Sequence, residues 1–226
     1  MAKVIKKKKI RILPFLLFIL IIAILVLIFE IFLDSKTKNI IIEGNDILSD
    51  QQIIRLAEIE DYPSFYKTMS SSIERKIKEN PWIKQVSVKK EFYHVLVIEV
   101  EEYKALFEKN NGKIVLENEE EVTLDKTLPY SIPRLTTEVS EDQYKSLIKK
   151  IQEVDEGVRQ KISEISYVPN DYDKDRFLLY MDDGNSVYLT LTKFDMINYY
   201  NDVLPQLDGR KGYLYLDSGN HFQIMQ

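Results

Sequence analysis

The chain has 226 residues, enough for one membrane anchor and about 190 residues of folded material in one or two small domains. It contains no cysteine, which excludes disulfides and thiolate zinc sites. Six basic residues before Ile12 contribute +6 to the net charge of −5 and leave −11 for the rest. The folded part therefore lacks the clustered Lys and Arg that binding to nucleic acid needs.

An uncharged apolar run, Ile12–Phe29, follows a basic N-terminal tail of residues 1–11. Extended to Leu33, the run predicts a transmembrane helix over 12–33, about 33 Å long against a hydrocarbon core of about 30 Å. Six cations precede the run, whereas Glu30, Asp34, Lys36 and Lys38 lie on its other flank, so the positive-inside rule predicts a cytoplasmic tail and an extracytoplasmic remainder. The alternative is a cleaved signal peptide, but its apolar core would be only about 7–15 residues long and would end at a small-x-small site.

Residues 36–103 predict a small module with the order strand, helix, helix, strand, strand. Gly44-Asn45 is a turn signal, Ser49-x-x-Gln52 is a capping box and Pro81 ends a helix. The expected elements are a strand over Lys36–Glu43, helices beginning near Ser49 and Ser70, and strands over Ile83–Lys89 and Val95–Glu101.

From Tyr103 the pattern changes to short strands and turns, which predicts a mixed, mainly β domain with two helices over 104–226. Ser140-x-x-Gln143 caps the first helix, and the second is expected over Lys193–Leu207. Two short strands, Gly212–Leu216 and Phe222–Met225, close the chain. The overall fold class is therefore α+β, with an N-terminal transmembrane helix.

We find no nucleophile elbow, Gly-rich phosphate loop or zinc-protease motif, so the sequence predicts neither a catalytic set nor a cofactor. Asp171, Asp173 and Asp175 resemble the start of a calcium loop, but Arg176 stands where an EF-hand needs Gly, which favours a solvated hairpin loop. Glu117 and Glu119–Glu121 could pair as acid and base, but a charged run in a turn is more typical of a solvated face.

The aromatic residues of the last two strands suggest an interaction surface. Tyr213, Tyr215 and Phe222 lie at the extreme C-terminus, where a late strand often forms the edge of a sheet. An edge offers unpaired N–H and C=O groups to the strand of a partner. The simpler interpretation is that these are half-buried β residues.

Several segments together resemble one known family. They are Ile41–Asn45 with Leu48-Ser49, the stretch Asn80–Val88 (NPWIKQVSV), Glu101–Tyr103, Lys211–Leu216 (KGYLYL), and Ile162–Tyr167 with Leu179–Gly184. They are similar to the POTRA module and C-terminal domain of the FtsQ/DivIB bacterial cell-division proteins, nearer the Gram-positive DivIB branch. Tyr93 departs from the family, which commonly has Pro in this hairpin.

The resemblance implies a POTRA domain (β-α-α-β-β) over 36–103, a β domain over 104–226 and no enzymatic activity. It implies a divisome scaffold in the cell membrane at the septum, which organises FtsL-like and DivIC/FtsB-like coiled-coil partners and supports septal peptidoglycan synthesis. The partners would include membrane lipid and the septal peptidoglycan synthase complex, with no nucleic acid. The implied partner-binding residues are Tyr213, Leu214, Tyr215, Leu216, Asp217, Ser218, Asn220, His221, Phe222 and Ile224.

Two other functions are alternatives. A membrane-anchored cell-wall enzyme would need clustered carboxylates, or a nucleophile with its base, in one cleft. A POTRA-bearing export scaffold would be expected to carry repeated modules or a following barrel.

Overall fold

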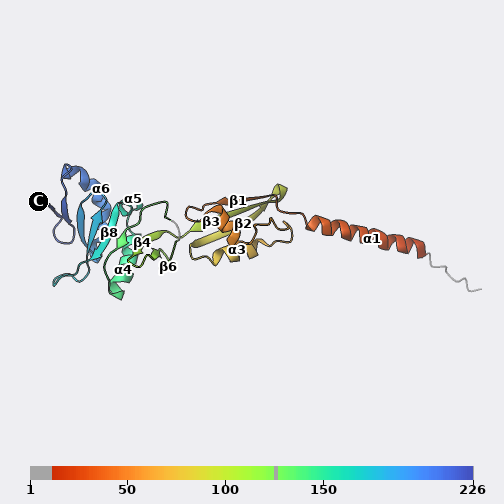
Figure 1. Ribbon diagram of the computed structural model, residues 1–226, viewed down its shortest axis with the longest axis horizontal. Coiled ribbons are helices and arrows are strands. Elements are labelled where there is room, and N and C mark those ends of the chain that lie inside the picture. Colours follow the sequence, from red (N-terminus) through yellow and green to blue (C-terminus); the bar gives the residue numbers. More distant parts are fainter. Residues whose placement is uncertain (1–11, 125–126, 226) are drawn as a thin grey trace, which may run out of the picture. The chain divides into compact units, whose positions relative to one another are not determined.

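The computed structural model describes residues 12–124 and 127–225, which form two compact units (Figure 1). The first unit extends through Glu79 and also contains Val86–Val100, whereas the second contains Asn80–Gln85 and the chain from Glu101 onward. The predicted basic tail, residues 1–11, lies outside the described residues.

Helix α1 (Ile12–Leu33) has the bounds that the apolar run predicts. Its large apolar side chains are exposed along its whole length, from Leu13 to Phe32. The stretch Leu13–Leu33 is long and apolar enough to cross a bilayer by length and composition. These properties fit a single-pass membrane protein, because lipid rather than a protein core would cover such a helix.

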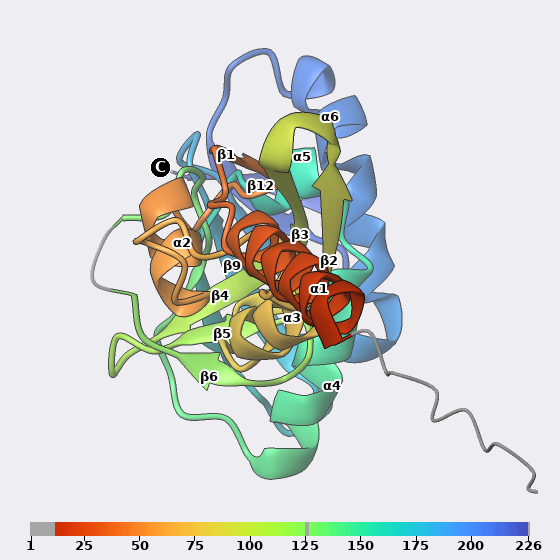
Figure 2. The same ribbon diagram turned by 90° about the vertical axis from the view of Figure 1, so that its right-hand side faces the viewer.

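Beyond α1, the first unit has the predicted order of elements. They are β1 (Asn39–Glu43), α2 (Asp50–Leu56), α3 (Ser70–Lys78), β2 (Ile83–Glu91), the 3₁₀ turn η1 (Phe92–His94) and β3 (Val95–Glu102). The sheet has the order β1-β3-β2, and β1 runs parallel to β3 with Asn39 opposite Val95. Figures 1 and 2 show α3 beside β2 and β3, and Ile73 and Ile77 are its buried residues.

Two local features of the first unit follow directly from the sequence. The Ser49 hydroxyl accepts the Gln52 backbone N–H at 3.3 Å, and the Gln52 side chain accepts the Ser49 N–H at 2.9 Å. This confirms the predicted capping box. Gly44, in the turn after β1, has φ +83°, and a Cβ there would lie 2.2 Å from the Val100 carbonyl oxygen. Glycine is required at this position on both counts.

The second unit is a long sheet covered by short helices. Its strands are β4 (Ala105–Lys109), β5 (Ile114–Leu116), β6 (Glu121–Val122), β7 (Arg134–Leu135), β8 (Ile162–Tyr167), β9 (Arg176–Met181), β10 (Ser186–Thr190), β11 (Gly212–Tyr215) and β12 (His221–Ile224). They form a sheet in the order β12-β11-β10-β9-β8-β7-β4-β5-β6. The helices are α4 (Glu141–Gln152), α5 (Glu156–Arg159), η2 (Leu191–Tyr199), α6 (Tyr200–Val203) and η3 (Leu204–Leu207).

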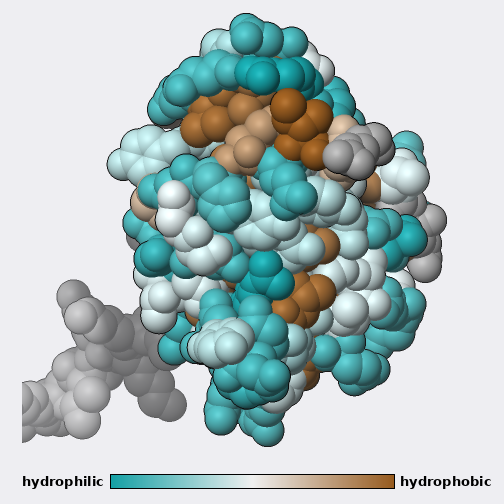
Figure 3. All heavy atoms as spheres, turned by 90° about the vertical axis from the view of Figure 1, so that its left-hand side faces the viewer, coloured by the Kyte–Doolittle hydropathy of each residue, from teal (hydrophilic) through white to brown (hydrophobic). Residues whose placement is uncertain are grey.

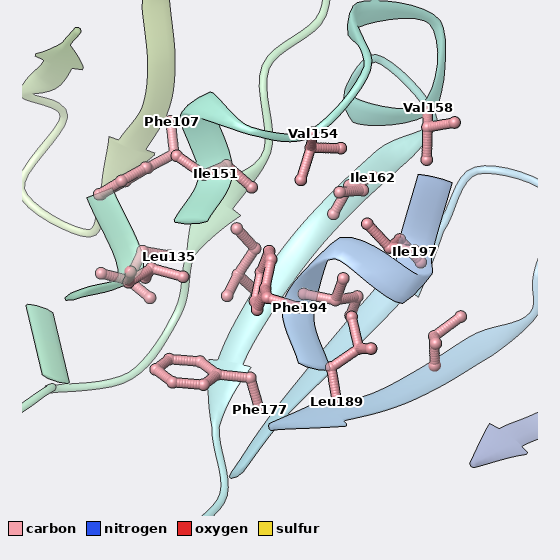
Figure 4. Packing of buried hydrophobic residues seen from close by; sticks show 14 of the residues in the cluster. Phe107, Leu135, Ile151, Val154, Val158, Ile162, Phe177, Leu189, Phe194 and Ile197 are labelled. Atoms are coloured by element: carbon pink, nitrogen blue, oxygen red, sulfur yellow. The ribbon is translucent and has the colours of Figure 1, made fainter. Parts of the chain in front are cut away.

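A single hydrophobic cluster joins these helices to the sheet. Phe107, Phe177, Leu189, Phe194 and Ile197 are all fully buried, and Figure 4 shows helical and strand residues pointing toward one another. The cluster extends to Leu214 and Leu216, at the end of the chain. The core therefore fixes the position of β11, against which the last strand pairs.

The helices of the second unit differ from the prediction in two details, and the short helix α5 is additional to the two expected. The helix expected over Lys193–Leu207 is instead η2, α6 and η3 in succession, with non-helical backbone at Lys193. Its Thr, Asn, Asp and Tyr residues are weak α-helix formers, and Pro205 cannot donate a backbone hydrogen bond. Ser140 does precede α4, but its hydroxyl bonds to the Gln143 side chain and not to the helix backbone.

Candidate functional site

The last strand, β12, lies at one edge of the nine-stranded sheet, as the position of these residues at the chain end predicts. It pairs antiparallel with β11, with Leu214 opposite Phe222 and Tyr215 opposite His221. We call residues 212–224 the edge hairpin. The opposite edge of the sheet is β6, which has two residues against four in β12. The edge hairpin is therefore the longer of the two edges on which another strand could pair.

The register identifies which backbone groups of β12 face away from the sheet. The Met225 N–H donates to the Lys211 carbonyl at 3.0 Å, immediately beyond the paired residues. Since hydrogen-bonded and non-hydrogen-bonded pairs alternate in an antiparallel ladder, His221 and Gln223 bond to β11. Phe222 and Ile224 therefore direct their N–H and C=O groups to the free edge.

The two faces of the edge hairpin have different roles. Leu214 and Leu216 are buried in the core, and Phe222 packs partly against it from β12. Tyr213 and Tyr215 alternate with these leucines and therefore lie on the other face. The first face attaches the hairpin to the domain, and the second carries an aromatic stack.

That stack runs across neighbouring strands to the edge. The Tyr188 ring on β10 lies 4.9 Å from the Tyr215 ring and 5.9 Å from the Tyr213 ring. Tyr215 in turn stacks on His221 of β12, at 4.5 Å and an interplanar angle of 5°. The guanidinium of Arg176, which belongs to β9, lies 3.9 Å from the centre of the Tyr188 ring. Such cross-strand contacts hold the edge strand in one register.

An ion pair fixes the start of the turn between β11 and β12. The Arg176 Nε atom lies 2.7 Å from Asp217 Oδ2, and the two side chains are only 18% and 8% exposed. Arg176 thus contacts both Tyr188 and Asp217. Loss of Asp217 would leave a poorly solvated charge without its partner, which costs more than loss of a surface pair.

A buried polar network fixes the beginning of β11. Asn185, 2% exposed, accepts the Gly212 N–H on its side-chain oxygen at 3.0 Å. Its amide nitrogen donates to Asp183 at 3.1 Å and to the Tyr200 hydroxyl at 3.1 Å. The Tyr200 hydroxyl donates to Asp183, with oxygens 2.8 Å and 2.9 Å away. Burial is the main cause that raises the pKa of Tyr200, with Asp183 adding to it, so the phenol stays a donor.

Gly212 is also the point of closest approach between the last two strands. A Cβ at this position would lie 2.1 Å from the Gln223 carbonyl oxygen and 2.7 Å from the Phe222 ring. No side chain larger than hydrogen fits without movement of β12. Gly212 therefore allows β12 to pair closely with β11.

An apolar groove borders the edge hairpin on its core-facing side. It has a volume of about 480 Å³ and lies between η2–α6–η3 and the strands β11 and β12. Val203, Leu207, Phe222 and Ile224 are among its lining residues, with Arg210 also in the lining. Figure 3, which faces the end of the molecule that carries the C-terminus, shows apolar surface bordered by hydrophilic residues. The groove could receive an apolar side chain from a segment paired with β12.

The structure brings the predicted partner-binding residues together in one hairpin but gives them unequal exposure. Ser218, Asn220, His221 and Ile224 are exposed. Tyr213, Tyr215, Asp217 and Phe222 are partly buried, whereas Leu214 and Leu216 are buried. The two leucines belong to the core, although both also contribute to the lining of the apolar groove.

Sequence reasoning missed the residues that hold the hairpin from outside it. Asp183 enters the sequence analysis only within the Leu179–Gly184 segment of the resemblance, Asn185 receives no role, and Arg176 appears only as a residue that breaks a calcium motif. Tyr200 falls within the helix expected over Lys193–Leu207, and neither it nor Tyr188 receives a role there. The one available signal was the density of polar residues in Asp182–Asn185, since a buried Asn needs hydrogen-bond partners.

The acidic groups considered for chemistry make local bonds. Glu121 lies 2.6 Å from Lys109, which is the main cause that lowers its pKa, and 3.5 Å from Lys113. A general acid needs the opposite shift in pKa. Asp173 accepts the backbone N–H of Asp175 at 2.8 Å, and Asp175 accepts a hydrogen bond from Gln143 at 3.1 Å. These carboxylates organise loops.

Comparison with known proteins decides the family. One family model, described as "POTRA domain, FtsQ-type", matches residues 35–103, and a second, "Cell division protein FtsQ/DivIB, C-terminal", matches residues 105–218. The chain belongs to the FtsQ/DivIB family of cell-division proteins. The predicted resemblance and the POTRA assignment of the first module are thereby confirmed, and a role in cell division follows.

Curated relatives agree with this assignment. The cell division protein DivIB of Bacillus cytotoxicus is 30% identical over 200 residues, which cover 84% of this chain and 77% of the relative. DivIB of Bacillus subtilis strain 168 is 29% identical over 84% of this chain and 74% of the relative. DivIB of Geobacillus kaustophilus is 28% identical over 94% of this chain and 84% of the relative. All three are Gram-positive proteins, as the resemblance to the DivIB branch predicts.

One solved structure is also similar. It is the major extracytoplasmic domain of the trans isomer of DivIB from Geobacillus stearothermophilus, 26% identical. The match covers 48% of this chain and 96% of that chain, with a TM-score of 0.40.

Proposed function

We propose that this protein is a non-enzymatic scaffold of the division machinery that binds a partner by strand addition at β12. The observation that carries the proposal is the free edge of β12, where Phe222 and Ile224 offer backbone donors and acceptors in a fixed register. A strand paired there would form up to about four hydrogen bonds, each contributing about 0.5–1.5 kcal/mol net.

Specificity would come from side chains beside that edge. The groove lined by Val203, Leu207 and Phe222 would take an apolar side chain of the added strand. Arg210 lies in the same lining and would favour a nearby acidic group. The exposed turn residues Ser218 and Asn220 would contact the end of the partner segment.

The proposed partners are FtsL-like and DivIC/FtsB-like single-pass coiled-coil proteins, with the septal peptidoglycan synthase complex acting further along the assembly. In this proposal, residues 1–11 are cytoplasmic, 12–33 span the membrane, and the POTRA domain (36–103) and β domain (104–226) are extracytoplasmic at the septum. The apolar α1 and the basic residues that precede it support this orientation.

Co-expression with the two coiled-coil partners, followed by capture of the full chain from a detergent extract, tests the proposal. Ile224→Lys places a charge on the exposed edge and should lower partner recovery at least several-fold. The matched control is Tyr172→Lys, in a fully exposed position of the same unit, which should leave recovery unchanged. Equal recovery with both variants would contradict strand addition at β12.

The alternative of a cell-wall enzyme makes a different prediction. The purified full chain, incubated with septal wall polymers and with lipid-linked wall precursors, should neither cleave nor extend them. Turnover by the chain alone would contradict a purely scaffolding role, whatever the partner capture shows.

A further inference from the structure

The exposed apolar side chains of the POTRA-containing unit gather at one end of it. Outside α1, the large hydrophobic residues of this unit with high exposure are Ile41, Tyr62, Tyr66, Met69, Phe92 and Tyr93. All but Ile41 belong to two segments, the loop before α3 and the turn between β2 and β3. We call these five residues the aromatic cap. Phe92 and Tyr93 are 91% and 84% exposed, which is unusual for rings of this size.

Both segments of the aromatic cap lie against the residues that follow α1. Asn39, the first residue of β1, is opposite Val95, so the turn at Phe92–His94 is at the end of the sheet where the chain enters from α1 (Figures 1 and 2). The Lys38 N–H donates to the His94 carbonyl at 2.9 Å. In the other segment, the Phe65 N–H donates to the Ser35 carbonyl at 2.9 Å.

The distance from the bilayer follows from chain length. Helix α1 ends at Leu33 and β1 begins at Asn39, so five residues separate them. Even fully extended, five or six residues reach no further than about 20 Å. The Ser64 hydroxyl donates to the Leu33 carbonyl at 2.5 Å, and Phe32 stacks on Tyr66 at 4.5 Å, so the aromatic cap adjoins the helix end itself. A helix that spans the membrane therefore places the cap at the headgroup layer.

The backbone of the turn is strained in a way that keeps two rings outside. Tyr93 and His94 both have left-handed backbone, with φ of 63° and 61°. The His94 ring packs edge-on against Phe65 and Tyr66, at 5.0 Å and 5.4 Å. Its two nitrogens have no hydrogen-bond partner among the residues described. The turn thus buries the His94 ring without hydrogen-bond partners for its nitrogens, while the rings of Phe92 and Tyr93 are exposed.

The charges beside the aromatic cap are mixed, with Glu91 next to Phe92 and Asp61 next to Tyr62, but two exposed lysines are available to an anionic surface. Lys36 and Lys38 flank the entry to β1, and neither forms an ion pair within 12–124 or 127–225. Lysines close to a membrane are attracted to anionic lipid headgroups, and Tyr and Phe favour the interface between headgroups and acyl chains. Exposed aromatic rings beside unpaired lysines are therefore typical of an interfacial contact with lipid.

We propose that the aromatic cap docks on the bilayer, with Phe92 and Tyr93 in the headgroup layer and Lys36 and Lys38 at lipid phosphates. This inference rests on the proposed membrane span of α1. The contact would hold the POTRA domain against the membrane, so that α1 is not its only attachment. The cap would bind the surface of the leaflet that lies on the same side of the membrane as the POTRA domain.

The absence of cysteine allows a direct test with single spin labels. The full chain is reconstituted in vesicles of phosphatidylethanolamine and phosphatidylglycerol, with a label at Glu91→Cys, next to the intact cap. Ile24→Cys, inside α1, and Tyr172→Cys, in the other unit, serve as references for bilayer and water. Collision rates with oxygen and with a water-soluble paramagnetic reagent give the depth of each label.

We expect the Glu91→Cys label to be shielded from the water-soluble reagent several-fold relative to Tyr172→Cys. Adding Phe92→Ser and Tyr93→Ser should remove that shielding while Ile24→Cys stays buried in lipid. A Glu91→Cys label as accessible as Tyr172→Cys would overturn the docking, and so would shielding that requires the division partners. A water-accessible Ile24→Cys label would instead refute the membrane span itself.

Discussion

Replacement of Gly212 by alanine should detach the last strand from the sheet while the core of the β domain stays folded. The added Cβ would lie 2.1 Å from the Gln223 carbonyl oxygen and 2.9 Å from its carbon. These are backbone atoms, so β12 must move by about 1 Å to restore a contact of normal length. Overpacking of this kind costs about 1–3 kcal/mol.

The cost is expected to appear locally, because in the part of the chain that the structure describes β12 pairs with β11 alone. If detachment relieves the strain, the opening equilibrium shifts about 5- to 150-fold, the equivalent of about 1–3 kcal/mol. Hydrogen exchange at the N–H groups of His221 and Gln223, which bond to β11, should accelerate by that factor. Exchange in β8 and β9 should not change.

The matched control is Gly157→Ala. Gly157 lies in the short helix α5, and among the described residues no atom beyond its chain neighbours and its own helix backbone is within 4 Å of an added Cβ. Alanine there should be neutral or stabilise slightly, by up to about 1 kcal/mol. If Gly212→Ala exchanges like Gly157→Ala and still captures the partners, the argument from close approach at Gly212 is wrong.

Three further substitutions test other parts of the structure by urea unfolding of the full chain in detergent. Gly44→Ala should destabilise the first unit by about 2–5 kcal/mol, since it adds left-handed strain to a clash with Val100, and a loss below about 1 kcal/mol would refute this. Phe177→Ala should cost about 3–5 kcal/mol, because its ring is fully buried in the core, and a smaller loss would mean that the core collapses around it. Burial opposes ionisation of Asp183, but hydrogen bonds from the Asn185 backbone and the Tyr200 hydroxyl outweigh it and lower its pKa. That stabilisation is present above the unfolded-state pKa of about 3.9 and is lost as the pH falls through the lower folded-state pKa. Asp183→Asn should therefore lower the free energy of unfolding by about 1–3 kcal/mol at pH 7, and by progressively less below about pH 4. A loss that does not depend on pH would contradict the role of the carboxylate charge.

Features encoded by neighbouring residues could be predicted from the sequence. The Ser49 capping box requires only residues three apart, and the uncharged apolar run Ile12–Phe29 makes up most of α1. The edge position expected for the last two strands is observed for β12, which lies at one end of the sheet order. The order of elements in the first unit is predicted for the same local reasons.

Features that depend on distant residues could not be predicted. Asn185 and Gly212 are 27 residues apart, and only the parallel pairing of β10 with β11 brings them together. The stack of Tyr188 on Tyr215 depends on the same pairing. The helix predicted over Lys193–Leu207 is broken although its apolar spacing is helical, and its contacts are also with distant residues: the Asn198 side-chain oxygen accepts the Asp155 backbone N–H at 2.9 Å.

The central claim, a partner strand on the free edge of β12, is tested most directly through one backbone group. Ile224→Pro removes an N–H that points away from β11 and places a ring on the edge, and the extended backbone of β12 accepts proline. Ile224→Ala is the control, because it shortens the side chain and keeps the N–H.

The measurement is partner recovery from detergent extract of cells that co-express the coiled-coil proteins, with urea unfolding confirming that both variants are folded. We predict that Ile224→Ala retains most of the recovery and that Ile224→Pro loses at least about tenfold, since both a hydrogen bond and the close approach of a second strand are lost. Equal recovery by the two folded variants would show that the partner does not pair with this edge.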